Sequence, residues 1–189
     1  QLGRFALHPK FVGVRHVLED EPDARFMMRE DFIRGIGKLA ALHLTYDLVL
    51  LSHHLPVACE LVEKFPGQPF VLDHIAKPLI KDRKRSPWEA EIRRLAAFPN
   101  VYCKVSGMVT EADWKSWKPA DFTPYLDVVF ECFGTDRIMI GSDWPVCTLA
   151  GSYRDVMQIA ADYLERLASD AQSKVWSENA ERFYGISDS

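Results

Sequence analysis

Residues Phe70–Pro78 read FVLDHIAKP: an apolar run that ends in the acid Asp73 and the imidazole His74. This is the pattern of a buried strand that is followed at once by polar residues. A second stretch, Arg137–Val146 (RIMIGSDWPV), repeats it, with Asp143 after the apolar run. Because functional groups of parallel α/β proteins gather at the carboxyl ends of the strands, we expect His74 and Asp143 to meet at one edge of a sheet.

Apolar runs of strand length alternate along the chain with stretches of helical period, which predicts βα units on a parallel sheet. Each run is almost continuously apolar, so we expect every strand to be covered on both faces. The predicted strands are Phe11–His16, Thr45–Leu51, Pro69–His74, Val101–Val105 and Arg137–Gly141.

The helices between these strands carry start and stop signals. We expect capping boxes at Ser86–Glu89 and Ser169–Gln172, and helix starts at Pro56 and at Thr123-Pro124. The glycines at 35 and 37 weaken the first helix. The predicted helices are 31–43, 56–65, 86–98, 123–134, 153–167 and 169–184.

The composition is that of an ordinary folded protein. The chain has 189 residues, of which 48% are hydrophobic, and a formal net charge of −4, which argues against nucleic-acid binding. No apolar run has the length of a membrane span, and we expect a cytoplasmic protein. The four cysteines form no Cys-x-x-Cys pair, so we expect no structural zinc site. Cys103 and Cys132 are expected to be small buried hydrophobes.

Two cations, Arg15 and Lys104, lie inside otherwise apolar strands. Burying an unpaired charge is costly, so each needs a carboxylate of the chain or an anionic group of a substrate. Asp47 and Asp73 are the candidate structural partners, and the residues alone leave both interpretations open.

His53 is adjacent to His54, which is a weak pattern for metal binding, but His53 remains a candidate for substrate contact. The basic stretch 77–85 is typical of a solvated loop.

The motifs resemble those of the amidohydrolase superfamily, in its sugar-lactone hydrolase branch of fuconolactonase-like and pyrone-dicarboxylate-lactonase-like enzymes. The resemblance extends over nearly the whole chain. It is carried by FVLDHIAKP and GSDWP in that order, together with GVRH (13–16), NVYCKVSG (100–107) and ENAERFYG (178–185).

The family fold is a (β/α)8 barrel, and the resemblance implies that this chain corresponds to its fourth to eighth strands. The family begins with a His-x-His motif on its first strand, which is absent here. We therefore expect residues 1–189 to be the C-terminal part of one barrel domain that lacks the N-terminal βα units. The position of the carbamylated lysine in binuclear relatives falls near Arg15, which argues against a two-metal centre.

The resemblance also implies a function: hydrolysis of a lactone, most simply of a sugar acid, in carbohydrate metabolism. Asp143 would activate the water with His74, and these two residues would hold one divalent ion, zinc or manganese, if a metal is used. A metal-independent route stays open. The expected substrate contacts are Arg15, His53, Lys104 and Trp144. The expected partner is a small lactone or carboxylate, and the resemblance is also compatible with assembly into a homo-oligomer.

Two alternatives come from other classes of protein. Five βα units could form a flavodoxin-like open sheet that serves as a binding or regulatory module, with His74 and Asp143 as incidental strand ends. The apolar strand at 11–14 argues against this reading, because an open sheet needs a short or charged edge. Related folds also carry metal-dependent decarboxylases, which would act on carboxylated aromatic compounds.

Overall fold

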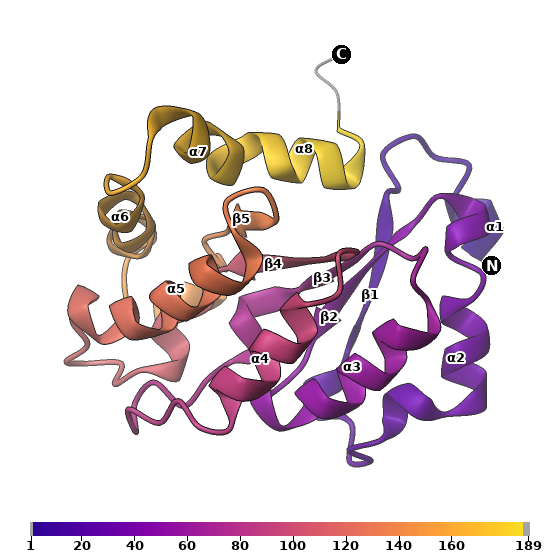
Figure 1. Ribbon diagram of the computed structural model, residues 1–189, viewed down its shortest axis with the longest axis horizontal. Coiled ribbons are helices and arrows are strands. Elements are labelled where there is room, and N and C mark those ends of the chain that lie inside the picture. The colour runs from indigo at the N-terminus through magenta and orange to yellow at the C-terminus, as the bar shows by residue number, and fades with distance from the viewer. Residues whose placement is uncertain (1, 187–189) are drawn as a thin grey trace.

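The computed structural model describes residues 2–186, and its centre is a parallel sheet of five strands (Figure 1). Each strand pairs with the next one along the chain, in the order β1-β2-β3-β4-β5. A flavodoxin-like sheet would have the order 2-1-3-4-5, so the flavodoxin-like topology of the alternative interpretation is wrong. The strands are β1 (Gly13–Val17), β2 (Thr45–Val49), β3 (Phe70–Leu72), β4 (Val101–Val105) and β5 (Ile138–Ile140).

Helices follow every strand. Among the described residues they are α1 (Leu2–Phe5), α2 (Glu30–Ile36), α3 (Leu55–Lys64), α4 (Trp88–Ala96), α5 (Pro119–Phe133), α6 (Tyr153–Leu164), α7 (Ser169–Ser173) and α8 (Asn179–Tyr184). Figure 1 shows α3, α4 and α5 side by side along the sheet, with α7 and α8 crossing on the other side. A π-helical turn, Lys174–Glu178, joins α7 to α8. None of these helices is long and apolar enough to cross a bilayer.

One predicted helix start and two predicted capping boxes are wrong, although the last helical stretch does begin at Ser169 as expected. The helix expected at Thr123 begins at Pro119, because the Asp121 carboxylate accepts the N–H of Lys118 and closes the first turn there. The capping box at Ser86–Glu89 does not form, since the Glu89 carboxylate pairs with Arg93 instead.

Ser169 does not cap the last helix either. Gln172 donates to the carbonyl of Leu167, and the capping position falls on Ala168. The helix expected to run to residue 43 ends at Ile36.

The two faces of the sheet differ. The main core lies between the sheet and α2–α6, whereas on the opposite face Val71 and Met139 pack against Phe183 of α8. The strand register places Arg15, Asp47 and Val71 in one row across that second face.

The expectation that every strand is covered on both faces is therefore wrong for two strands. The first is β1, which lies at one edge of the sheet and runs from half-buried to exposed residues. The second is β4, which alternates between buried and half-buried residues. Cys103 is fully buried as predicted, but Cys132 is only partly buried.

Candidate functional site

The imidazole of His74 and the carboxylate of Asp143 meet at the carboxyl edge of the sheet, as the sequence predicts. Nε2 of His74 lies 3.6 Å from Oδ1 of Asp143, and the two side chains are only 14% and 16% exposed. The separation is longer than a hydrogen bond, so both groups keep capacity for a third partner between them. On the other side of the ring, Nδ1 of His74 is 2.8 Å from the hydroxyl of Ser106, which follows β4.

The protonation of His74 is set by its surroundings. Burial lowers the pKa of His74, and the charges of Lys77 and Lys104 act in the same direction. The carboxylates of Asp143 and Asp73 oppose them without reversing the shift. The imidazole is therefore neutral near pH 7, the form that can accept a proton or donate a lone pair to a metal.

Glycine at position 107 is required for this arrangement. Gly107 has a φ of +62°, and a Cβ added there would lie 2.7 Å from Nδ1 of His74. Such a contact is far inside normal van der Waals distance, so the imidazole can lie where it does only because residue 107 has no side chain. Gly107 and Ser106 together fix the plane of the ring.

The backbone that carries His74 adopts an unusual conformation. Residues 74–77 all have positive φ, with values of 54°, 47°, 59° and 47°. Left-handed backbone costs about 1–2 kcal/mol of conformational free energy per residue for L-amino acids, and we expect a larger cost at the β-branched Ile75. Tertiary contacts hold the turn: Ile75 and Ala76 are fully buried, and the indole of Trp88 donates to the carbonyl of Ile75 at 2.7 Å. Strain of this kind concentrates at functional sites.

The structure pairs the cation Lys104 with carboxylates of the chain. Its ammonium lies 2.5 Å from Asp47 and 2.8 Å from Asp73, and the hydroxyl of Tyr184 donates to the same Asp47 at 2.8 Å. Burial alone would lower the pKa of Lys104, but the charges of Asp73 and Asp47 raise it above its ordinary value. Lys104 therefore stays charged and has its partners within the fold.

Arg15 has a partner on the same face but remains accessible. Its guanidinium donates to Asp73 at 3.2 Å, while its side chain is 53% exposed and Asp73 is 1% exposed. The structure thus supplies both of the carboxylates that the sequence offered as structural partners. The exposed part of the guanidinium remains free to contact an anion.

Two other candidates, His53 and Trp144, have no polar contact with the pair among the described residues. His53 is exposed and lies against His54, with ring centres 3.9 Å apart. Trp144 is 66% exposed directly after Asp143.

Three charged residues near the pair are not among the candidates that the sequence indicates. The basic stretch 77–85 predicts a solvated Lys77, but its side chain is only 20% exposed and forms an ion pair with Glu19. Glu111 lies close enough that the charges of Lys77, Glu19 and Asp143 all act on it, and burial raises its pKa. For Lys77 the signal was its place inside the FVLDHIAKP motif; Glu19 and Glu111 belong to short turns without a recognisable pattern.

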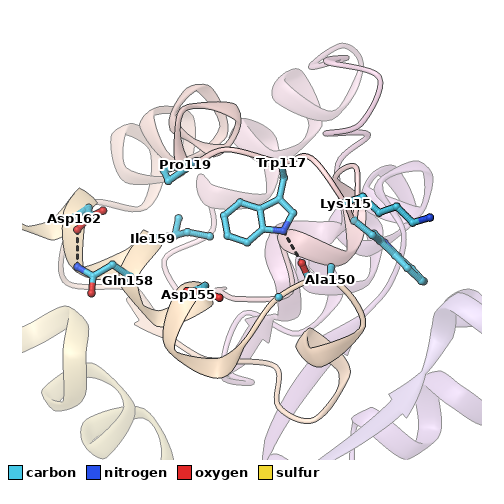
Figure 2. Close-up of a pocket in the computed structure, with 10 residues that line it drawn as sticks. Lys115, Trp117, Pro119, Ala150, Asp155, Gln158, Ile159 and Asp162 are labelled. Carbon is cyan, nitrogen blue, oxygen red and sulfur yellow. Dashed lines mark hydrogen bonds between the residues drawn. The ribbon is translucent and has the colours of Figure 1, made fainter.

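A surface hollow of about 370 Å³ lies away from this pair. Figure 2 shows the indole of Trp117 pointing into it and donating to the carbonyl of Ala150, at 2.7 Å. Neither His74 nor Asp143 lines this hollow. Within residues 2–186, no three His, Cys, Asp or Glu side chains come together as a metal site.

Comparison with known proteins identifies relatives over nearly the whole chain. A family model described as amidohydrolase matches residues 1–186. L-fucono-1,5-lactonase from Burkholderia multivorans is 38% identical over 188 residues, and the match covers 94% of this chain and 64% of that protein. L-fucono-1,5-lactonase from Burkholderia ambifaria is 34% identical, and the match covers 98% of this chain and 65% of that protein. The chain thus spans slightly less than two thirds of the length of these relatives.

Solved structures of related proteins have a similar fold over nearly the whole chain. An amidohydrolase from Burkholderia multivorans with bound zinc superposes with a TM-score of 0.91 at 38% identity, over 95% of this chain and 66% of that one. A 2-pyrone-4,6-dicarboxylic acid hydrolase from Pseudomonas putida, described as putative, superposes with a TM-score of 0.76 at 20% identity, over 94% of this chain and 64% of that one. The second likeness bears on the fold alone.

Proposed function

The chain belongs to the amidohydrolase family, and on that premise we propose that the whole protein hydrolyses a lactone, most simply that of a sugar acid. The observation that carries the proposal is the facing pair of His74 and Asp143, with 3.6 Å between Nε2 and Oδ1. Two relatives more than 30% identical are named L-fucono-1,5-lactonase, which favours a sugar-acid lactone as the substrate class.

The chemistry follows from the positions of the two groups. The Asp143 carboxylate takes a proton from a water molecule as the water oxygen attacks the lactone carbonyl carbon. The carbonyl oxygen becomes an oxyanion, and the neutral His74 stabilises it by donating from Nε2. When the ring C–O bond breaks, Asp143 returns its proton to the departing ring oxygen, which becomes a hydroxyl. The product is the open hydroxy acid.

Ser106 sets the tautomer of His74. If the Ser106 hydroxyl donates to Nδ1, the ring hydrogen lies on Nε2 and points toward the reacting centre. If Ser106 instead accepts from Nδ1, the lone pair of Nε2 is free. The first tautomer suits the metal-independent route and the second suits a metal ligand.

The pair offers two of the ligands that a divalent metal ion would need. The related zinc-bound structure motivates the test, and His74 Nε2 and Asp143 Oδ1 are donors of the types that zinc or manganese accepts. A catalytic zinc takes about three protein ligands, and residues 2–186 bring no third such side chain to the pair. When bound, the ion would lower the pKa of the attacking water. The roles of His74 and Asp143 described above do not require it.

The position of Arg15 on the open face of the sheet supports a substrate contact, since its side chain is half exposed beside Asp73. Lys104 contributes positive charge to the same face while it remains paired with Asp47 and Asp73. His53 and Trp144 stay as outer contacts for a lactone or carboxylate. This assignment predicts that Arg15 affects KM more than kcat.

We also propose that these five strands are the fourth to eighth strands of an eight-stranded barrel. The sequential strand order and the share of the relatives that the chain covers support this placement. The remaining strands would close the barrel over the face that carries Arg15 and Asp47. The domain would then include residues 1–189 as its C-terminal part; residue 1 and residues 187–189 lie outside the described structure.

The test is replacement of Asp143 by Asn in the whole protein, assayed with 1,5- and 1,4-lactones of sugar acids. We expect kcat to fall by about 100-fold or more, because the amide cannot accept the proton from water. Asp162→Asn is the matched control, since Asp162 is exposed and bonded to Gln158 on α6. Unchanged lactone turnover in the Asp143 variant would exclude the assigned role. Turnover of carboxylated aromatics in place of lactones would favour the decarboxylase alternative.

A further inference from the structure

The turn that carries His74 has to be held against its own conformational preference. Four consecutive residues, 74–77, lie in the left-handed region, and none of them is glycine. The hydrogen bond from the N–H of Lys77 to the carbonyl of His74, at 2.8 Å, closes the turn locally. A single local bond does not select this conformation over a right-handed one, so the selecting contacts come from elsewhere in the fold.

One end of the turn has a fixed position. Asp73 is buried and contacts both Lys104 and Arg15 on the open face of the sheet. The middle is held by burial of Ile75 and by the indole of Trp88. The remaining end is Lys77, whose backbone is itself left-handed with a φ of 47°. The contacts of the Lys77 side chain therefore decide whether the last residue of the turn is restrained.

The ammonium of Lys77 forms an ion pair with the Glu19 carboxylate, which lies in the short 3-10 turn Leu18–Asp20 that follows β1. Both side chains are 20% exposed, so the pair is partly shielded from solvent and stronger than an ordinary surface pair. Lys77 also acts on the partly buried Glu111, whose pKa its charge lowers against the effect of burial. The ion pair thus joins the turns after β1 and β3, and the charge of Lys77 also acts on Glu111 in the turn after β4.

We propose that Lys77 is a positioning residue: through its ion pair with Glu19 it fastens the left-handed turn Asp73–Lys77 to the end of β1 and so keeps Nε2 of His74 facing Asp143. The inference rests on the proposed function, in which that pair performs lactone hydrolysis. Lys77 does not itself contact the reacting atoms. Its effect is on where the imidazole lies, and therefore on kcat more than on KM.

The test compares Lys77→Met, Glu19→Gln and Lys77→Arg in the whole protein, with Lys81→Met as the control. Lys81 is an exposed lysine in the same connection and lies outside this ion pair. We expect Lys77→Met and Glu19→Gln each to lower kcat by about tenfold or more with KM within about twofold, because a catalytic group loses its alignment. Lys77→Arg keeps most of the wild-type kcat, because the arginine can still pair with Glu19. The double variant, which combines Lys77→Met with Glu19→Gln, is no slower than Lys77→Met alone.

A second readout does not depend on activity. The NMR resonances of the imidazole nitrogens and protons of His74 report the surroundings of the ring directly. They are assigned as the signals that disappear from the spectrum of the His74→Gln variant. We expect them to move in Lys77→Met and in Glu19→Gln and to stay in place in Lys81→Met. If Lys77→Met does not fold, Glu19→Gln decides the question, since it removes the same ion pair without replacing any residue of the turn.

The outcomes separate the two proposals. A wild-type protein that opens no lactone contradicts the proposed function, and the His74 resonances alone then test the role of Lys77. Wild-type kcat in Lys77→Met and Glu19→Gln overturns the positioning role. So does a fall in kcat with unmoved His74 resonances, because Lys77 would then act by some route other than the turn.

Discussion

Charged groups gather in two regions of this molecule, the open face of the sheet and its carboxyl edge, and the two regions treat charge differently. On the face, Lys104 is within 2.8 Å of two carboxylates, and Asp47 has a second donor in Tyr184. At the edge, His74 and Asp143 face each other at 3.6 Å without a direct hydrogen bond. On the open face the opposite charges are paired within the fold, whereas the facing groups at the edge have no direct bond to each other and are available for chemistry.

The largest expected effect is on the free energy of unfolding, and it comes from removing the paired cation of the open face. Lys104→Met leaves Asp47 and Asp73 buried without their shared cation, and we expect a loss of about 3–5 kcal/mol in the free energy of unfolding. Arg15→Met is the comparison, because Arg15 is half exposed and its pair should contribute less than about 1 kcal/mol. Urea denaturation of the two variants of the whole protein measures both. Similar small losses would show that Lys104 is not the structural centre of the open face.

The next effect concerns activity at the edge. In Gly107→Ala the new methyl group would lie 2.7 Å from Nδ1 of His74, so the imidazole must move. We expect kcat to fall by about 100-fold, as for other small displacements of a catalytic group. Gly134→Ala is the matched control: it has the same φ of +62°, and a Cβ there meets no atom within 4 Å. Equal activities of the two variants would contradict the role given to the contact at residue 107.

The smallest effect is a dependence of stability on pH. Burial lowers the pKa of His54 below its ordinary 6.5, and Nδ1 accepts the N–H of Leu51 at 3.2 Å. The unfolded chain therefore binds a proton more readily than the folded one, and stability falls as the pH drops below 6.5 toward the folded pKa. His54→Gln should reduce this loss when urea unfolding is compared at about pH 5 and pH 7. An unchanged loss would assign the dependence to other groups, His74 among them.

The parallel α/β fold could be predicted from the sequence because its signals are local. The strand Val101–Val105 is predicted to the residue, and the convergence of His74 with Asp143 follows from their places after apolar strands. The candidate partners of Lys104 were also correct, since a buried cation needs a carboxylate and few were available within neighbouring strands.

The turn at residues 74–77 could not be predicted, because its residues do not prefer the conformation they adopt. Ile75 in particular disfavours positive φ, and what holds it is the indole of Trp88, a contact that no local pattern reveals. The burial of Lys77 cannot be predicted for the same reason, because beside the exposed basic residues that follow it this lysine resembles a solvated one. Its partner Glu19 lies in a different turn of the chain.

The central claim is that His74 and Asp143 act as one unit, and a double-mutant cycle on kcat/KM for a sugar-acid lactone tests it most directly. The proteins compared are the wild type, His74→Asn, Asp143→Asn and the double variant. We predict that each single change lowers kcat/KM by about 100-fold or more and that the double variant is about as slow as the slower single variant. Losses that multiply, or a single variant with wild-type activity, would contradict the account.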